Sequence, residues 1–229
     1  MKTYPIFILI EDKPCLVVGG GVVGERKVLD LREAGARVTV LSQTLTPTLT
    51  ELAQAGQIRY LNEAFTPDHL NGMVLAMAAT DDREVNARVS AAAQKRSIWV
   101  NVADDPEFCT FIVPAQVRHG DLTLAISTGG ASPAVAQKLR QELELHYGPE
   151  YKPYLTLLKG VRCRLLIERR GHPENAALFH HLVDSPLLEA VAVGDRARVV
   201  AVLQEVLGEA LSPQVLGELT SEAFQESWG

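Results

Sequence analysis

The sequence predicts an α/β protein, with a Rossmann-like, doubly wound parallel sheet followed by a small helical C-terminal domain. Strand-like and helix-like segments alternate over the first 126 residues. A glycine-rich turn follows an uncharged apolar strand, and strand-like segments disappear after Glu150. We expect domain limits at 1–114, 115–149 and 150–229.

The alternating part is typical of βαβ units, in which right-handed crossovers favour a doubly wound sheet. Cys15–Val18 and Met73–Ala78 carry no charge, as expected of parallel strands covered on both faces. The predicted strands are Ile6–Ile10, Cys15–Val18, Arg37–Leu41, Ile58–Leu61, Met73–Ala78 and Ile98–Val102, and the predicted helices are Glu25–Ala34, Pro47–Ala55, Pro67–Leu70 and Arg83–Lys95.

Two further apolar runs, Thr110–Pro114 and Leu122–Ser127, stand on either side of a turn at Gly120-Asp121. They form either a hairpin or two strands that extend the sheet. Ser132-Pro133 predicts the N-cap and first residue of a helix that runs to about His146. Helices are then expected throughout, with apolar-rich ones at Leu187–Val193 and Arg196–Leu207.

The glycine-rich turn fits the pattern G-x-G-x-x-G through Gly19, Gly21 and Gly24. The first glycine permits a tight turn, the second lets a pyrophosphate approach the backbone, and the third lets the helix pack closely on the strand. The N–H groups and the positive dipole end of the following helix then face the phosphates. The turn predicts dinucleotide binding by residues 1–114; a purely structural turn is the alternative.

Composition excludes several classes of protein. The chain has 229 residues, 47% of them hydrophobic and 22% charged, with a net charge of −6. An acidic chain argues against nucleic-acid and membrane partners. Three widely spaced cysteines form neither a metal motif nor a disulfide framework, and we find no signal peptide and no apolar run long enough to span a membrane. We therefore expect a cytoplasmic protein.

The cofactor type is left open by the residues after the second strand of the glycine-rich unit. Ser42, Gln43 and Thr44 stand where NAD-binding folds carry an acid for the ribose, and no arginine follows to hold a 2′-phosphate. Their hydroxyls and amide are candidates to bind the ribose. Thr80 and Asp81 follow the fourth such strand and are a second candidate contact; Asp81 and Asp82 are equally interpreted as N-cap and first-turn acids of the next helix.

Asp104 is the candidate acid–base residue. It follows the strand Ile98–Val102, close to Asn101, and ligands of open α/β sheets bind beyond the carboxyl ends of strands. Its carboxylate could accept a proton or hold a metal ion. The alternative is an Asx-turn at Asp105-Pro106, with Asp104 merely solvated.

Two candidate anion sites lie further along the chain. Ser127, Thr128 and Gly129 begin a loop that resembles an anion-binding loop with two free glycine N–H groups, or else a linker between domains. Residues 152–170 are rich in Lys and Arg, and on a helix Lys152, Lys159 and Arg170 align, with Arg162 and Arg169 to one side. This basic face suggests a polyanionic ligand; a solvated face paired with acids of another subunit is the alternative.

These motifs together resemble a known family. Gly19–Gly24 is followed by Glu25-Arg26-Lys27, and then by the segments 79–82, 101–104 and 127–133. Pro5-Ile6-Phe7 matches as well. The chain is similar, over about residues 3–145, to the precorrin-2 dehydrogenase/sirohydrochlorin ferrochelatase family of siroheme synthesis. Its members are stand-alone enzymes or the N-terminal part of multifunctional siroheme synthase.

The resemblance implies that precorrin-2 is oxidised to sirohydrochlorin with NAD and that ferrous iron is then inserted to give siroheme. It assigns Asp104 to both steps, including transient contact with Fe²⁺, and assigns Val22, Val23, Gln43 and Thr44 to NAD. Asn101, residues 127–129, Lys159 and Arg162 are then candidates for binding the polycarboxylate tetrapyrrole.

The resemblance also implies a homodimer, with 115–149 as the dimerisation region. Thr128 stands where some members carry a serine that can be phosphorylated, and Gly24 replaces a commoner alanine, which we expect to be harmless. Because the chain ends at Gly229, the uroporphyrinogen methyltransferase module is expected to be absent. The rival from another class is a non-catalytic NAD-sensing Rossmann domain, which would need only the glycine turn.

Overall fold

The computed structural model describes residues 2–225, so the predicted domain limits at 1 and 229 lie outside the described residues. The chain divides into two compact units. One unit is Tyr4–Val113, and the other is built from residues 114–225 with the first residues of the chain. Each unit is described by itself below.

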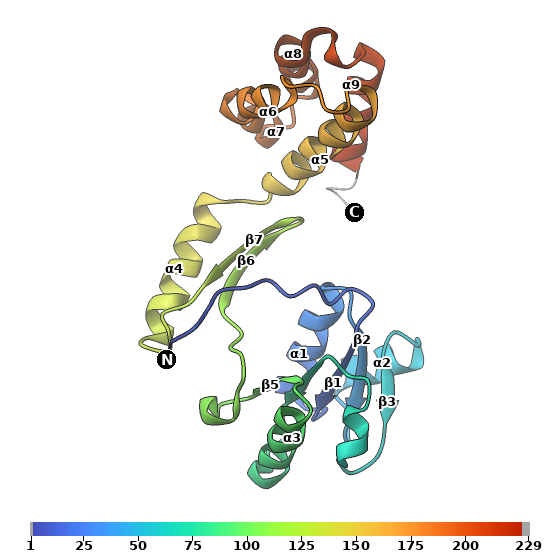
Figure 1. The fold of residues 1–229 in the computed structure, drawn as a ribbon, viewed down its shortest axis with the longest axis vertical. Helices are drawn as coiled ribbons and strands as arrows, with labels where there is room; N and C mark the ends of the chain where they lie inside the picture. Colours follow the sequence, from blue (N-terminus) through green and yellow to red (C-terminus); the bar gives the residue numbers. More distant parts are fainter. Residues whose placement is uncertain (1, 226–229) are drawn as a thin grey trace. The chain divides into compact units, whose positions relative to one another are not determined.

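The first unit is a five-stranded parallel sheet, which confirms the predicted doubly wound α/β fold (Figure 1). The strand order β3-β2-β1-β4-β5 places the first strand in the middle. Each strand lies within a predicted range or begins one residue before it, and the bounds are β1 Pro14–Val18, β2 Arg37–Leu41, β3 Arg59–Leu61, β4 Leu75–Ala78 and β5 Trp99–Val102.

Alternating strand residues supply the cores on the two faces of this sheet. Cys15 and Val17 of β1 pack with α1 (Val22–Glu33) and α2 (Pro47–Gln54). Leu16 and Val18 point to the opposite face, where α3 (Arg83–Lys95) and the short 3₁₀ helix η1 (Pro67–Leu70) cover them. Period-two alternation of apolar residues on both faces explains why β1 lacks polar positions.

Two strand predictions are wrong. Ile6–Ile10 pairs with no strand, and its residues Phe7 and Leu9 are 72% and 90% exposed. This apolar run is therefore not part of the sheet. Thr110–Pro114 is also no strand. Thr110 lies along the edge of β5 and bonds to Val100 through its backbone N–H and its side-chain hydroxyl. Its N–H donates to the Val100 carbonyl at 2.8 Å and its Oγ1 accepts from the Val100 N–H at 2.8 Å.

The second unit opens with an antiparallel hairpin, β6 (Ala115–His119) and β7 (Leu122–Ile126), whose turn is Gly120-Asp121 as predicted. The hairpin forms a separate two-stranded sheet and does not extend the parallel one. Helix α4 (Pro133–His146) follows, with Ser132 as N-cap: the Ser132 Oγ accepts from the Val135 N–H at 3.3 Å.

The rest of this unit is helical, as predicted: α5 Tyr151–Glu168, α6 Asn175–Asp184, α7 Leu187–Ala192, α8 Arg196–Leu207, η3 Gly208–Ala210 and α9 Pro213–Gln225. Leu157, Val161 and Leu165 of α5 are buried in its core. Because α5 ends at Glu168, the predicted extension of this helix through Arg169 to Arg170 is wrong, and Arg170 does not align with Lys152 and Lys159 on it. Arg169 is the C-cap of the helix and pairs with Glu174 at 3.2 Å. Across residues 2–225, no helix combines the length and the apolar character needed to cross a membrane.

The cysteines offer a test of this packing. Burial raises the pKa of the Cys15 thiol on β1 to about 11, whereas Cys163 is exposed. The Cys15 thiolate therefore forms only as the pH rises towards that value, and at about pH 8 the thiol stays protonated and covered. We expect alkylation followed by mass spectrometry to label Cys163 in the native protein and Cys15 only after denaturation. Labelling of native Cys15 at the rate of Cys163 would contradict the packing of β1.

Candidate functional site

The carboxyl ends of four strands meet at one edge of the parallel sheet. Gly19 continues β1, and its N–H donates to the Leu41 carbonyl at the end of β2 at 2.9 Å. On the other side, the Ala79 N–H donates to Val18 at 2.8 Å and the Ala103 N–H donates to Ala78 at 2.9 Å. Asp104 and the segments predicted to bind the cofactor therefore lie along the same edge of the sheet. Open α/β sheets bind ligands at this edge.

The glycine turn has the shape that a dinucleotide requires. A Cβ at Gly19, whose φ is +117°, would collide with the Ala79 carbonyl, and one at Gly24 would collide with the Gly19 carbonyl. A Cβ at Gly21 would meet no protein atom within 4 Å, and Gly21 caps α1 without a side-chain hydrogen bond. The open second position and the helix N-terminus leave room and donors for a diphosphate, so these residues fit the implied cofactor.

The contact at Gly24 qualifies one sequence-based expectation. The sequence predicts that glycine in place of alanine at this position is harmless. Because a Cβ at Gly24 would collide with backbone, an alanine here requires the turn to shift.

Of the residues after β2, one supports the glycine turn and the next two line an open cavity. Ser42 Oγ accepts a hydrogen bond from the Gly20 N–H at 3.0 Å, so this hydroxyl supports the glycine turn directly. Gln43 and Thr44 are exposed and line a cavity of about 490 Å³ together with Tyr60 of β3. Val22, in the first turn of α1, is 80% exposed. These placements leave Gln43, Thr44 and Val22 accessible to a ligand.

The structure separates the two acids after β4. Asp82 is the N-cap of α3, and its Oδ1 accepts from the Glu84 N–H at 2.8 Å and the Val85 N–H at 3.1 Å. Asp81 is exposed and is not the cap. The Thr80 hydroxyl donates within the protein, with Asn86 Oδ1 at 2.8 Å and the Asp82 carbonyl at 3.0 Å as acceptors. Thr80 thus shapes the turn, while Asp81 points a carboxylate to solvent.

Asp104 is exposed and has φ +59°, a left-handed backbone that Asp and Asn tolerate better than most residues. The Asx-turn alternative at Asp105 is not what the structure has. Asp105 Oδ2 instead accepts from Arg83 Nε at 3.2 Å, and no side-chain cap forms at the following 3₁₀ helix η2 (Pro106–Phe108).

The loop after Asp104 is fastened to β5 and α3. Cys109 Sγ accepts from the Val102 N–H at 3.1 Å, and Ser90 Oγ of α3 donates to the Phe108 carbonyl at 2.6 Å. Asn101 is buried and its Nδ2 donates to the Phe111 carbonyl at 3.1 Å. These bonds preorganise the loop, which holds the strained conformation of Asp104. The predicted contact of Asn101 with substrate stays a prediction.

Lys27 is a neighbour of Asp104 that sequence reasoning did not single out. It lies on the same face of α1 as the buried residues Gly24, Val28 and Leu31. Burial lowers the pKa of its ammonium group, and attraction to Asp30, Asp104 and Cys109 opposes that effect. Its spacing from Gly24 was the available signal, because a charge on the sheet-facing side of a helix calls for a partner.

The other candidate residues belong to the second unit. Thr128 Oγ1 donates to the Ser132 carbonyl at 3.1 Å and accepts from the Ser132 N–H at 3.2 Å. The expectation of two free glycine N–H groups is wrong, because the Gly129 N–H donates to Ser127 Oγ at 3.1 Å. The loop 127–129 therefore satisfies part of its own backbone.

The basic face of α5 is partly neutralised. Lys159 Nζ pairs with Asp121 Oδ2 at 3.0 Å, so the tip of the β6–β7 hairpin contributes an acid to it. Arg162 is exposed on the same helix. For the described residues, no group of three or more His, Cys, Asp or Glu is placed to hold a metal ion.

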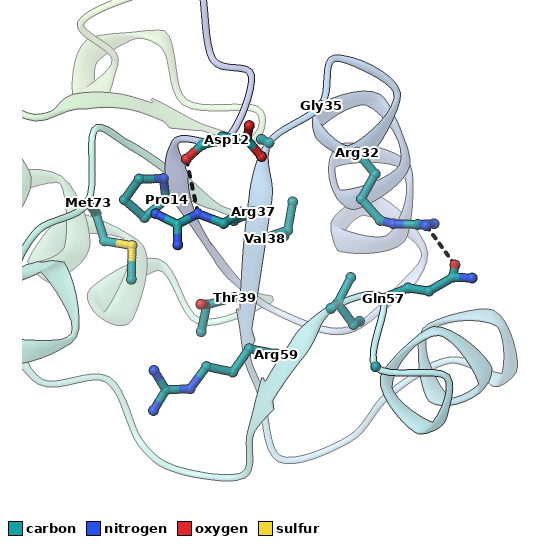
Figure 2. A pocket seen from close by; sticks show the side chains of 13 residues that line it. Asp12, Pro14, Arg32, Gly35, Arg37, Val38, Thr39, Gln57, Arg59 and Met73 are labelled. Atoms are coloured by element: carbon teal, nitrogen blue, oxygen red, sulfur yellow. Dashed lines mark hydrogen bonds between the residues drawn. The ribbon is translucent and has the colours of Figure 1, made fainter.

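A cavity of about 620 Å³ lies at the opposite, amino edge of the parallel sheet (Figure 2). Arg37 and Arg59, which begin β2 and β3, line it with Arg32, whose Nη2 donates to Gln57 Oε1 at 2.6 Å. Arg37 Nε donates to the Asp12 carbonyl at 3.0 Å. None of the predicted site residues lines this cavity.

Two family models match the chain. One, described as putative NAD(P)-binding, matches residues 6–115, and the other, described as sirohaem biosynthesis protein central, matches residues 119–146. The first covers the parallel sheet with the glycine turn and Asp104, and the second covers the hairpin tip, the 127–129 loop and α4.

Curated relatives and a solved structure agree with these models. A siroheme synthase of Methylobacillus flagellatus is 53% identical over 63% of this chain and 31% of its own length, and that of Nitrosomonas eutropha is 37% identical over 96% and 46%. The chain spans less than half the length of these relatives. The structure of "SirC, precorrin-2 dehydrogenase" matches with a TM-score of 0.73 and 27% identity, over 89% of this chain and 98% of that one.

Proposed function

Since this chain belongs to the precorrin-2 dehydrogenase/siroheme synthase family, we propose that it oxidises precorrin-2 to sirohydrochlorin with NAD in siroheme biosynthesis. The observation that carries the proposal is the position of Asp104. It stands at the same sheet edge as the glycine turn, on a fastened loop, with its carboxylate exposed. A sensing domain of the non-catalytic kind would have no use for such a carboxylate.

The glycine turn, Val22, Val23, Gln43 and Thr44 would hold the cofactor, with Ser42 and Thr80 shaping the two turns beside it. When bound, NAD supplies the acceptor for the two electrons and one hydrogen that leave the macrocycle. Asp104 accepts the proton that is released at the same time, so that the balance closes with one NADH per sirohydrochlorin. We propose NAD because the family resemblance implies it; Ser42, Gln43 and Thr44 offer neither an acid for the ribose nor a cation for a 2′-phosphate.

The family suggests ferrous iron insertion as a second activity, with iron as a substrate. Asp104 again supports it, since an exposed carboxylate can contact Fe²⁺ briefly and take a pyrrole proton. Exposed Arg162 and neighbouring cations of α5 suit the carboxylates of a tetrapyrrole. Lys159, Ser127, Thr128, Gly129 and Asn101 remain candidates for substrate contact.

An anaerobic assay tests both activities. The protein is mixed with precorrin-2 and NAD, and NADH and tetrapyrrole absorbance are followed before and after ferrous iron is added. We expect NADH and sirohydrochlorin first, and siroheme after the iron. Formation of NADH without siroheme would mean that the protein has the dehydrogenase activity only. The absence of any NADH would contradict the proposal.

We also propose that a second copy covers the hairpin and α4. Only Val117 is buried in β6 and β7, no residue of α4 is buried, and Val135 and Leu139 on one face of α4 are 48% and 39% exposed. A two-stranded sheet with one thinly covered helix is marginal in water, so an apolar partner would stabilise it.

Replacing both Val135 and Leu139 with Asp is therefore expected to shift the protein from dimer to monomer in sedimentation velocity runs. Burying an unpaired charge at an apolar interface costs free energy, which weakens association. The matched control is Gln137→Asp, which adds a charge to an exposed position of α4 off that face. A wild type that sediments as a monomer would exclude the dimer, and a double variant that stays dimeric would move the interface elsewhere.

A further inference from the structure

Asn86 is the buried polar side chain of α3 that contacts the turn after β4. It is 7% exposed, and its amide is engaged on both sides by Thr80. Asn86 Oδ1 accepts from the Thr80 N–H at 3.2 Å and from the Thr80 hydroxyl at 2.8 Å, while Nδ2 donates to the Thr80 carbonyl at 2.9 Å. One side chain thus satisfies both backbone groups and the hydroxyl of a single residue.

These hydrogen bonds take the place of strand pairing, which ends just before Thr80. The last parallel partners of β4 pair Val18 with Ala78, and the Ala79 N–H makes one more bond to the Val18 carbonyl at 2.8 Å. Beyond this point Thr80 has no neighbouring strand for its N–H and carbonyl. A side-chain amide carries one acceptor and donors like a peptide group, so Asn86 continues the pairing where the sheet ends.

The turn that Asn86 holds touches the glycine turn. A Cβ at Gly19 would collide with the Ala79 carbonyl and would lie 3.1 Å from the Thr80 nitrogen. The peptide joining Ala79 and Thr80 therefore forms one wall beside the first glycine of the turn. A small displacement of this wall changes the space that a diphosphate and its riboses can occupy at the sheet edge.

We propose that Asn86 is a positioning residue for the cofactor: through Thr80 it fixes the Ala79–Thr80 turn against Gly19 and so sets the wall on which the dinucleotide rests. The inference depends on the proposed binding of NAD at this edge. Asn86 acts through Thr80, because its amide is buried and engaged there. Loss of the amide removes the side-chain partners of the N–H and carbonyl of half-buried Thr80 and leaves the turn free to move.

The test measures NAD binding by titration calorimetry, without substrate. Asn86→Ala is expected to weaken NAD binding by about tenfold, the scale that the loss of hydrogen bonds to partly buried groups produces. At saturating NAD, kcat and the KM for precorrin-2 are expected to stay within about twofold of wild type, because the chemistry at Asp104 is unchanged. The matched control is Gln94→Ala, an exposed amide on the same helix whose Nε2 donates to Ser90 Oγ at 2.9 Å.

Two further variants separate positioning from stability. Asn86→Asp keeps the size and the acceptor for the Thr80 N–H but places an oxygen against the Thr80 carbonyl; we expect a folded protein with the same weakening. Thr80→Val removes the hydroxyl, whereas Thr80→Ser retains it. In the Thr80→Val background, the loss caused by Asn86→Ala is expected to be smaller than in wild type, because the two residues act as a unit.

The outcomes are distinct. Wild type that binds no NAD would contradict the proposed function itself. Wild type that binds NAD, beside folded Asn86→Ala and Asn86→Asp proteins that bind it equally well, would overturn the role of Asn86. A lower melting temperature with unchanged NAD affinity would make Asn86 a structural residue only, and additive losses in the cycle with Thr80→Val would confine its action to the N–H and carbonyl of Thr80, without the hydroxyl.

Discussion

Asp104→Asn is expected to lower kcat for precorrin-2 oxidation by roughly 100-fold or more while the affinity for NAD changes by less than about twofold. Asparagine has the size of aspartate but cannot accept the proton. The substitution suits this position because Asp104 has φ +59°, a conformation that Asn tolerates and Ala adopts at a cost. Single-turnover formation of NADH, together with calorimetric binding of NAD, measures both effects.

The matched control is Asp12→Asn. Asp12 has a similar left-handed backbone, with φ +55°, and stands at the amino edge of the same sheet beside Arg37. We expect it to leave NADH formation unchanged. Full oxidation by Asp104→Asn, or an equal loss in Asp12→Asn, would show that the carboxylate of Asp104 takes no proton. If iron insertion also depends on Asp104, siroheme formation by Asp104→Asn should fall as well.

Gly21→Ala is expected to weaken NAD binding by more than tenfold without harming the fold. At Gly21 the backbone is extended, with φ −79°, and an added Cβ meets no protein atom within 4 Å. The methyl group would instead fill the space through which a diphosphate approaches the N–H groups at the start of α1. Titration calorimetry measures the affinity, and thermal unfolding monitors the fold.

Gly217→Ala serves as the control, because a Cβ there also meets nothing within 4 Å and the residue lies within α9, where Ala is favourable. Gly19→Ala is less informative: its Cβ would collide with the Ala79 backbone, so loss of binding would follow from a distorted turn. Unchanged NAD affinity in folded Gly21→Ala would mean that the cofactor does not approach this glycine.

The parallel sheet could be predicted from the sequence because its strands are short and apolar. Glycines and helix-capping residues also mark where the strands end and the helices begin. The glycine turn, the Ser132 cap and helix α8 all lie where local signals placed them. The same local signals misled at Ile6–Ile10 and Thr110–Pro114. An apolar run becomes a strand only if a neighbour pairs with it, and for Thr110 a side chain supplies the bond to Val100 that a ladder would have made.

The places of the glycines and of Asp104 at strand ends could be predicted, because they follow from the fold class; their roles in binding and catalysis stay predictions. The contacts of the supporting residues could not be predicted. Asn86 stands on a helix, and its partner Thr80 stands on a turn that reaches it only by folding. The number of residues between Asn86 and Thr80 in the chain carries no sign of their hydrogen bonds. Lys27 was signalled by its spacing from Gly24, but no pattern in the sequence points from it to Asp104. Cys109 likewise gave no sequence signal, because its Sγ accepts from the Val102 N–H where β5 meets its own following loop.

Hydrogen–deuterium exchange with and without NAD tests most directly whether the carboxyl edge of the parallel sheet is the cofactor site. We predict that NAD slows amide exchange at 19–24, 42–45 and 79–82 and leaves residues 35–39 and 57–59, beside the arginine-lined cavity of Figure 2, unchanged. Slower exchange at that cavity alone, or no change at the glycine turn at saturating NAD, would contradict the account.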